Sequence, residues 1–115
     1  MINYGTAPAV DEIEVTLFGP GFGEAIAIHI GEGLWMLVDS CVDPHSHEPA
    51  SATYLNAVGV DPSKVRAIVA SHWHDDHVRG MSKLATTYPG AEFYLASIFN
   101  NTEGAYFLSA YSGNA

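Results

Sequence analysis

The stretch that decides the fold is Ser71-His72-Trp73-His74-Asp75-Asp76-His77, in which three histidines and two aspartates follow a short apolar run. Imidazole and carboxylate groups are typical ligands of zinc, and His72, His74, Asp76 and His77 provide four of them. If the chain leaves a strand here in extended form, His72 and His74 lie on the same side, because side chains alternate along a strand. These two histidines can then share one metal ion.

Asp76 and His77 follow at once. Because consecutive Cα atoms are about 3.8 Å apart, these side chains could serve a second ion roughly 3.5–4 Å from the first. The alternative is a polar loop in which histidines cluster by chance, since the chain contains six of them. A His-x-His-x-Asp-His pattern at the end of a β-type run is a demanding coincidence, so we favour metal ligation.

The composition limits the class of protein. The chain has 115 residues, of which 48% are hydrophobic and 15% charged, and this indicates one globular domain over residues 1–115. A net charge of −9 disfavours a broad basic face for nucleic acid. The four basic residues flank the histidine cluster, so a local patch for an anionic substrate stays open. Arg79 and Lys83 are four apart, however, which favours a solvated helix face.

Cysteine content and hydropathy point to the compartment. Cys41 is the single cysteine, so no internal disulfide can form, and an inert, partly buried thiol is favoured over a nucleophile. The N-terminus lacks the positive region of a signal peptide, and no apolar run reaches the length of a membrane span. We therefore expect a soluble, cytoplasmic protein with no membrane partner.

Periodicity predicts alternating strands and helices around the cluster. Apolar alternation indicates three meandering strands, then a helix, a buried strand, the histidine cluster, a second helix and a last strand. The expected strands are 13–18, 24–30, 34–39, 65–70 and 92–96, and the expected helices are 49–58 and a segment from about Val78 to Tyr88. Residues 97–115 give a weak pattern to which no role is assigned.

Four further polar residues are candidates for the site. Asp39 ends an apolar strand, where burying a carboxylate is costly unless a cation or a hydrogen-bond donor meets it, although an ordinary cap is an equal alternative. His29 is expected on the polar face of the sheet or with a local partner, and not as a ligand. His45 and His47 belong to a polar loop and are expected to be exposed, although this loop could line the mouth of the site.

This order of elements resembles the first half of a metallo-β-lactamase-fold hydrolase. The motif from Ser71 to His77 matches the signature of that family in full, and Leu37-Val38-Asp39-Ser40 is similar to its earlier aspartate motif. The resemblance covers roughly residues 13–98. It implies an α+β fold, the αββα sandwich, in which two sheets lie between helices and one or two metal ions sit at one edge of the sheets.

The resemblance also implies roles for these residues. His72 and His74 would bind the first zinc ion, Asp76 and His77 the second, and Asp39 would support the ligands. Iron or manganese would also suit this ligand set. The usual nucleophile is metal-activated water, which Asp76 could help to orient, and the bond attacked is an ester, thioester, lactam or phosphodiester. Asp75 occupies a variable position and receives no role.

The sequence departs from the family after the cluster. A complete site takes a further histidine for the first metal, a bridging aspartate and another histidine for the second, but no histidine follows His77 and the later acids are Glu92 and Glu103. We therefore expect an incomplete domain that is inactive alone, either a truncated reading frame or a half whose partner supplies the rest. Its missing second sheet would leave an apolar face and a strand edge exposed.

Two other interpretations remain open at this point. The chain could be a non-catalytic metal-binding or protein-interaction module. One ion would then be held by His72, His74 and either Asp76 or His77, and a homodimer would bury the incomplete sheet. It could also be a fragment that does not fold. Composition and spacing do not identify the substrate.

Overall fold

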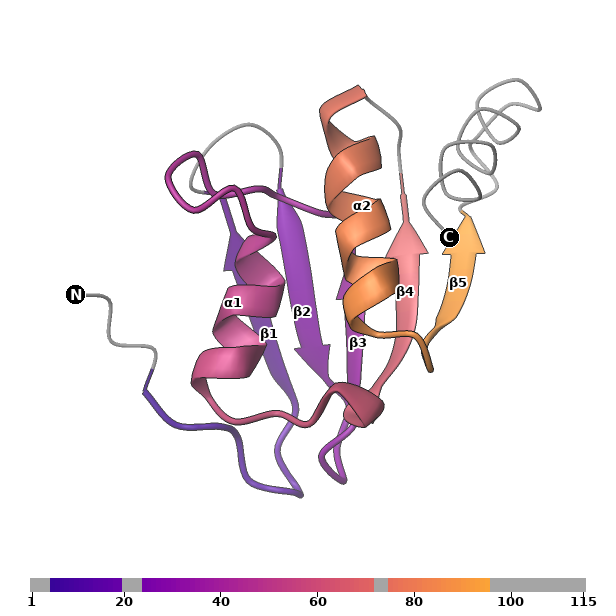
Figure 1. Cartoon of the computed structure of the whole chain (residues 1–115). Coiled ribbons are helices and arrows are strands. Elements are labelled where there is room, and N and C mark those ends of the chain that lie inside the picture. Colours follow the sequence, from indigo (N-terminus) through magenta and orange to yellow (C-terminus); the bar gives the residue numbers. More distant parts are fainter. Residues whose placement is uncertain (1–4, 20–23, 72–74, 96–115) are drawn as a thin grey trace.

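A computed structural model describes residues 5–19, 24–71 and 75–95, and for 75–79 the backbone alone. The order of its elements is the expected one (Figure 1). They are β1 (Glu14–Phe18), β2 (Ala25–His29), β3 (Trp35–Val38), α1 (Ala50–Ala57), the short 3₁₀ helix η1 (Pro62–Lys64), β4 (Val65–Ala70), α2 (Asp75–Thr87) and β5 (Glu92–Leu95). The expected weak pattern of residues 97–115, Glu103 included, lies outside the described residues.

The strands form one mixed sheet in the order β1-β2-β3-β4-β5. The first three are an antiparallel meander, whereas β4 runs parallel to both β3 and β5. Parallel strands end at the same edge of a sheet, and Val38 of β3 is paired with Val69 of β4. The segments that follow these two strands therefore start side by side, which brings Asp39 next to Ser71.

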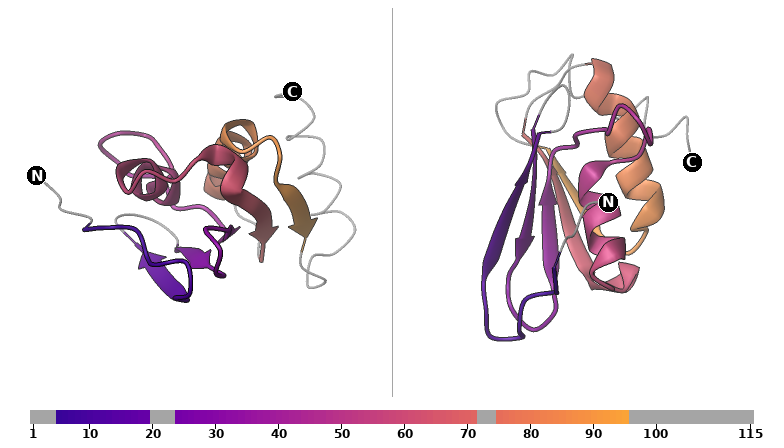
Figure 2. Two further views of the ribbon diagram at one scale, coloured as in Figure 1. Left: turned by 90° about the horizontal axis from the view of Figure 1, so that it is seen from below. Right: turned by 90° about the vertical axis from the view of Figure 1, so that its left-hand side faces the viewer.

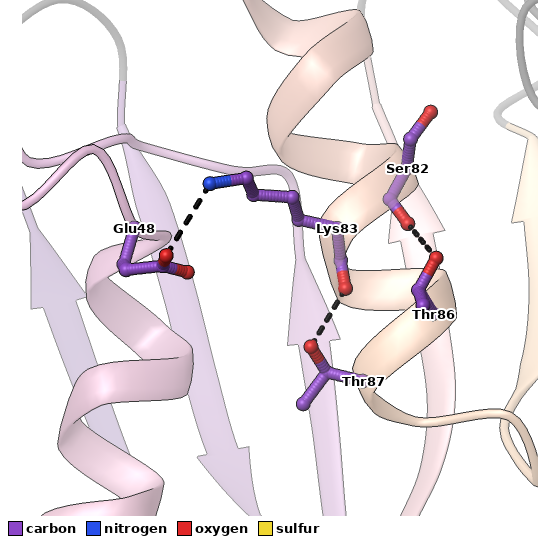
Figure 3. A pocket seen from close by; sticks show the side chains of 5 residues that line it. All are labelled: Glu48, Ser82, Lys83, Thr86 and Thr87. Atoms are coloured by element: carbon purple, nitrogen blue, oxygen red, sulfur yellow. Dashed lines mark hydrogen bonds and ion pairs between the residues drawn. The ribbon is translucent and has the colours of Figure 1, made fainter. Parts of the chain in front are cut away.

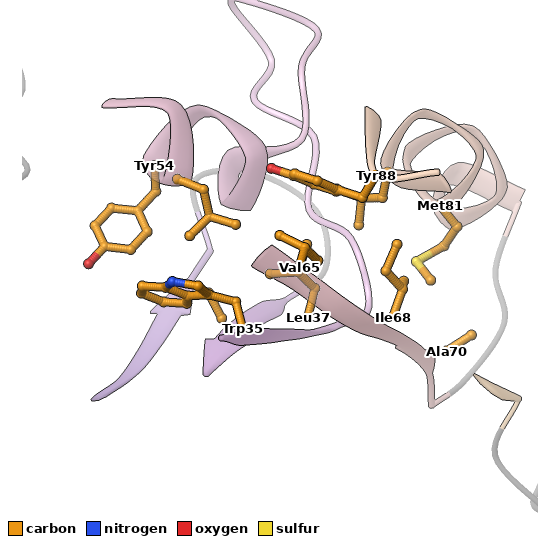
Figure 4. Close-up of a cluster of buried hydrophobic side chains, with 11 residues drawn as sticks. Trp35, Leu37, Tyr54, Val65, Ile68, Ala70, Met81 and Tyr88 are labelled. Carbon is orange, nitrogen blue, oxygen red and sulfur yellow. The ribbon is translucent and has the colours of Figure 1, made fainter. Parts of the chain in front are cut away.

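Both helices cover the same face of the sheet (Figure 2). A single cluster of buried side chains fills the space between helices and strands, and Figure 4 shows α1 and α2 each contributing to it. The cluster consists of Ala27, Trp35, Leu37, Tyr54, Leu55, Val65, Ile68, Ala70, Met81, Leu84 and Tyr88. Met81 and Tyr88 are thus core residues, as the helical spacing predicted.

The opposite face of the sheet is apolar and uncovered in the part of the chain that the structure describes. Along β1, Val15 and Leu17 are 61% and 72% exposed, and Tyr94 of β5 is 48% exposed. Ile26 and Ile28 of β2 lie on this face and are half-buried. Apolar side chains of this face are thus accessible to solvent in the described residues.

The helix boundaries differ from the prediction in one important place. Helix α1 ends as expected, because Gly59 follows it with a left-handed φ of +82° that suits glycine. Helix α2, in contrast, begins at Asp75 and not near Val78, so the last three residues of the histidine cluster belong to its first turn. No helix among the described residues has both the length and the apolar character needed to cross a membrane.

Candidate metal centre

Asp39 connects the end of β3 to the start of the histidine cluster. Its side chain is buried, with 7% of the residue exposed. Its Oδ1 accepts a hydrogen bond from the backbone N–H of Ser71 at 2.7 Å, and its Oδ2 accepts another from the Ser71 hydroxyl. The backbone N–H of Asp39 donates to the Val69 carbonyl at 2.7 Å. The carboxylate therefore holds the residue directly before His72.

The backbone of Asp39 adopts an uncommon conformation. Its φ is +59°, in the left-handed region that aspartate and asparagine tolerate better than most residues. This conformation turns the chain sharply after β3, while the carboxylate bonds Ser71, directly after β4. Of the two alternatives from the sequence, the hydrogen bonds to Ser71 are those of a turn cap. The support of a metal site by Asp39 stays a prediction.

The second pair of candidate ligands is carried by a helix. Asp76 and His77 lie in the first turn of α2, so their backbone positions are those of a rigid element and not of an extended turn. Asp75 and Asp76 also suit this place because carboxylates stabilise the positive end of a helix dipole. His72 and His74 lie outside the described residues, and the arrangement of the four ligand side chains remains a prediction.

Two residues that the sequence analysis missed lie beside this loop. Gly80, in α2, packs directly on Ser40, which follows Asp39 in the chain. The available signal was a glycine within an amphipathic helical pattern. Such a glycine destabilises the helix by about 1 kcal/mol relative to alanine, so it usually has a packing reason. Ser71 was noted only as part of the motif. Its two hydrogen bonds to Asp39 depend on the pairing of β3 with β4.

The other His-x-His segment forms a surface loop. His45 and His47 are exposed, as predicted. Asp43 Oδ1 accepts hydrogen bonds from the backbone N–H groups of Ser46 and His45, and these bonds lower the pKa of the Asp43 carboxyl. Across the described residues no group of three metal-binding side chains gathers. The hydrogen bonds of this loop are those of local turns.

His29 is buried inside the sheet, not placed on a polar face. It is 1% exposed. Its Nδ1 donates to the Glu12 carbonyl at 2.6 Å, and its Nε2 accepts from the Gly33 N–H at 3.1 Å. The expectation of a polar face was wrong, whereas that of a local partner is confirmed. Both ring nitrogens are engaged, so His29 has none left for a metal.

The basic patch for an anionic substrate, which the sequence left open beside the cluster, has little support at Lys83. Its Nζ donates to the His47 carbonyl at 2.8 Å and forms an ion pair with Glu48 at 3.4 Å (Figure 3). The pocket drawn in Figure 3, of about 230 Å³, is otherwise lined by hydroxyl side chains of α2. Two of these, Thr86 and Thr87, donate back to carbonyls of their own helix. Cys41 is fully buried, whereas a partly buried thiol was expected.

Comparison with known protein families decides which fold this sheet and loop represent. The family model described as the metallo-beta-lactamase superfamily matches residues 18–113. The chain belongs to the metallo-β-lactamase superfamily. The matched region contains both the Asp39 turn and the whole histidine cluster, so the resemblance inferred from these motifs is confirmed.

Solved structures of this superfamily share the fold. Hydrolase AbOPH of the beta-lactamase superfamily is 25% identical with a TM-score of 0.50, and the match covers 79% of this chain and 36% of that one. Metallo-beta-lactamase SMB-1 bound to 2-mercaptoethanesulfonate is 21% identical with a TM-score of 0.55, covering 80% and 35%. No match was found among curated proteins.

The chain thus spans about a third of the length of these structures. Its mixed sheet and two helices correspond to part of the metallo-β-lactamase fold, as the element order predicted. The match is partial, so it shows the fold of residues 1–115 and not the activity of a whole enzyme.

Proposed function

We propose that this chain carries the first ligands of a metal-dependent hydrolase, which acts on an ester, thioester, lactam or phosphodiester bond. The observation that supports it most is the bond between Asp39 and Ser71. It fixes the chain at the paired ends of β3 and β4, directly before the His-x-His-x-Asp-His motif and within the superfamily match. Burying a carboxylate is costly, so its use to fix the start of one loop indicates that this loop must be precisely positioned.

The proposed ligands fall into two pairs, one before α2 and one in its first turn. His72 and His74 would hold one ion and Asp76 and His77 a second, with zinc the expected metal and iron or manganese alternatives. Three imidazoles and a carboxylate suit these metals chemically. When bound, such ions act as Lewis acids and lower the pKa of the water that attacks the substrate. Asp76 would additionally orient this water.

The proposed site is incomplete in residues 1–115. Four protein ligands divided between two ions give each ion two, whereas catalytic zinc typically takes three. We therefore propose that further ligands come from other polypeptide, either more of the same protein or a partner, and that residues 1–115 alone hydrolyse their substrate at most very slowly. The exposed faces of Val15 and Leu17 give such polypeptide an apolar surface to cover.

The chain contains its own control for a test of metal binding. The double variant His72→Ala/His74→Ala removes the proposed ligands, and His45→Ala/His47→Ala removes an equally spaced pair from the surface loop. Cobalt titrated into each protein, followed by its visible absorption and by metal analysis after dialysis, reports binding. Circular dichroism checks that each variant keeps its fold.

The first variant should lose cobalt binding and the second should keep it. Equal binding by all three proteins would contradict the assignment of His72 and His74. Turnover of a phosphodiester or ester by residues 1–115 with two bound ions would contradict the incomplete site. One tightly held ion per chain without turnover, even after the rest of the protein is supplied, would favour a non-catalytic module.

A further inference from the structure

Gly80 approaches the segment after β3 more closely than any other amino acid would allow. A Cβ atom on Gly80 would lie 2.1 Å from Ser40 Oγ and 2.8 Å from Ser40 Cβ. Non-bonded carbon atoms prefer separations of about 3.5–4.0 Å. Glycine within a helix costs about 0.5–1 kcal/mol relative to alanine, so its presence in α2 needs a compensating reason. The close contact with Ser40 provides it.

Ser40 is a firm surface for this contact. It is 2% exposed, and its Oγ has no hydrogen-bond partner among the described residues. The close atoms include its Cβ, which moves only with the backbone, and Val42 Cγ2 would lie 3.1 Å from the same added Cβ. A side chain on residue 80 would therefore displace α2 and not merely rotate a flexible group.

The face of α2 that meets Ser40 is the one that carries two proposed ligands. Gly80 comes three residues after His77 and four after Asp76, and residues at these spacings share one side of a helix. Asp76 and His77 are also near the helix end that the chain enters from β4 (Figure 1). Any change in the separation of α2 from Ser40 thus moves this pair relative to Asp39.

We propose that the contact between Ser40 and Gly80 positions the Asp76–His77 pair, whereas the Asp39–Ser71 bond fixes the residue directly before His72. Asp39 and Ser40, which follow β3, would then act on the two pairs of proposed ligands by different kinds of contact. Asp39 forms hydrogen bonds to Ser71, before the first pair, and Ser40 limits by van der Waals contact how closely α2 can approach. This inference rests on the proposed ligand roles.

A set of size changes at the contact tests the inference. Gly80→Ala introduces the clash, Ser40→Ala in the same protein removes only the Oγ atom, and Ser40→Gly removes both close atoms. Gly90→Ala is the matched control, since a Cβ on Gly90 meets nothing within 4 Å. The readouts are the cobalt affinity, the visible cobalt spectrum and the thermal unfolding temperature of each variant.

The relevant signal is the cobalt binding that Asp76→Ala/His77→Ala abolishes. Gly80→Ala should weaken this binding at least about tenfold, within the range for loss of a residue that orients ligands, and should alter the spectrum. Adding Ser40→Ala should restore part of the binding and adding Ser40→Gly most of it, while Gly90→Ala changes nothing. Rescue in this order also shows that the helix was displaced and not unfolded.

Different results separate the two proposals. If the wild type binds cobalt through His72 and His74 but Gly80→Ala binds it equally well, the positioning role is overturned and the proposed function stands. If Asp76→Ala/His77→Ala changes nothing, the positioning role and the assignment of a second ion to this pair are both overturned, while the assignment of His72 and His74 stands. If Gly80→Ala unfolds the chain and Ser40→Gly restores the fold without restoring the cobalt spectrum, the contact is only structural. A wild type that binds no cobalt overturns both.

Discussion

His29 on β2 and Trp35 on β3 are direct partners across the sheet, with ring centroids 5.1 Å apart and planes inclined at 54°. Trp35 in turn meets Tyr54 of α1 edge-on, at a centroid distance of 6.1 Å. A histidine is thus built into the aromatic part of the core, below the helices. The two hydrogen bonds of His29 attach the segment before β1, at Glu12, and the β2–β3 turn, at Gly33, to this core.

Replacing His29 by phenylalanine should destabilise the fold although it preserves a ring against Trp35. The Glu12 carbonyl and the Gly33 N–H would lose their partner, and we expect a loss of about 2 kcal/mol in the free energy of unfolding, measured with urea. The Gly33 amide should also exchange faster with solvent. In the wild type, nitrogen-15 spectra should show the proton that Nδ1 donates to the Glu12 carbonyl; a proton on Nε2 would contradict the assigned bonds.

Asp39 should tolerate asparagine far better than alanine. Asparagine keeps an acceptor for the Ser71 N–H and accepts the left-handed backbone, so the expected loss in unfolding free energy is about 1 kcal/mol. Alanine removes both acceptors and is strained at this φ, so the expected loss is about 3 kcal/mol.

Ser71→Ala is the control for the hydroxyl alone and should cost about 1 kcal/mol, because the backbone bond to Asp39 remains. Chemical denaturation of the metal-free chain measures all three variants. Equal losses for asparagine and alanine at position 39 would contradict the expectation that an amide oxygen can replace the carboxylate as acceptor.

Tyr88 should make the chain sensitive to alkaline pH. Burial raises the pKa of the Tyr88 phenol to about 12 in the folded chain, whereas the unfolded value is about 10. Above the unfolded value, the unfolded chain releases this proton more readily, so its contribution to stability is present below pH 10 and is lost as pH rises toward 12. Tyr88→Phe should therefore lose less stability than the wild type between neutral and alkaline pH. Parallel urea titrations test this, and an identical loss in both proteins would refute it.

The uncovered face of the sheet should make residues 1–115 self-associate when isolated. Val15→Lys places a charge on this face and should shift the chain toward monomer in sedimentation experiments. Val10→Lys is the matched control, since Val10 is 64% exposed but precedes the first strand. A wild-type chain that is monomeric at every concentration, or an equal shift in both variants, would contradict a role for this face.

Local patterns predicted the elements but not the face on which the core lies. The strand at 65–70 has the predicted bounds, because a short apolar run between a turn and a polar cluster leaves little choice. In β2, however, the small residues Ala25 and Ala27 face the helices together with His29, while the larger Ile26 and Ile28 lie on the open face. Both faces are apolar, so alternation could not show which one the helices cover.

The contacts of the candidate site were less predictable for a different reason. Asp76 and His77 matched a ligand motif, and this interpretation overlooked that acidic residues such as Asp75 and Asp76 also favour a helix N-terminus. The bonds of Asp39 to Ser71 and the contact of Ser40 with Gly80 join distant parts of the chain. Such pairs follow from the parallel arrangement of β3 and β4 and have no signature within a local window of sequence.

The parallel pairing of β3 with β4 also bears on when the site can form. The meander of β1, β2 and β3 closes through short connections, whereas Asp39 and Ser71 are 32 residues apart and meet only after α1 has crossed the sheet. Contacts between distant residues form late because closing a long loop costs entropy before any bond is gained. We therefore expect the bonds between Asp39 and Ser71 to form after the meander, so that a metal ion held by the following loop would meet strands that are already paired.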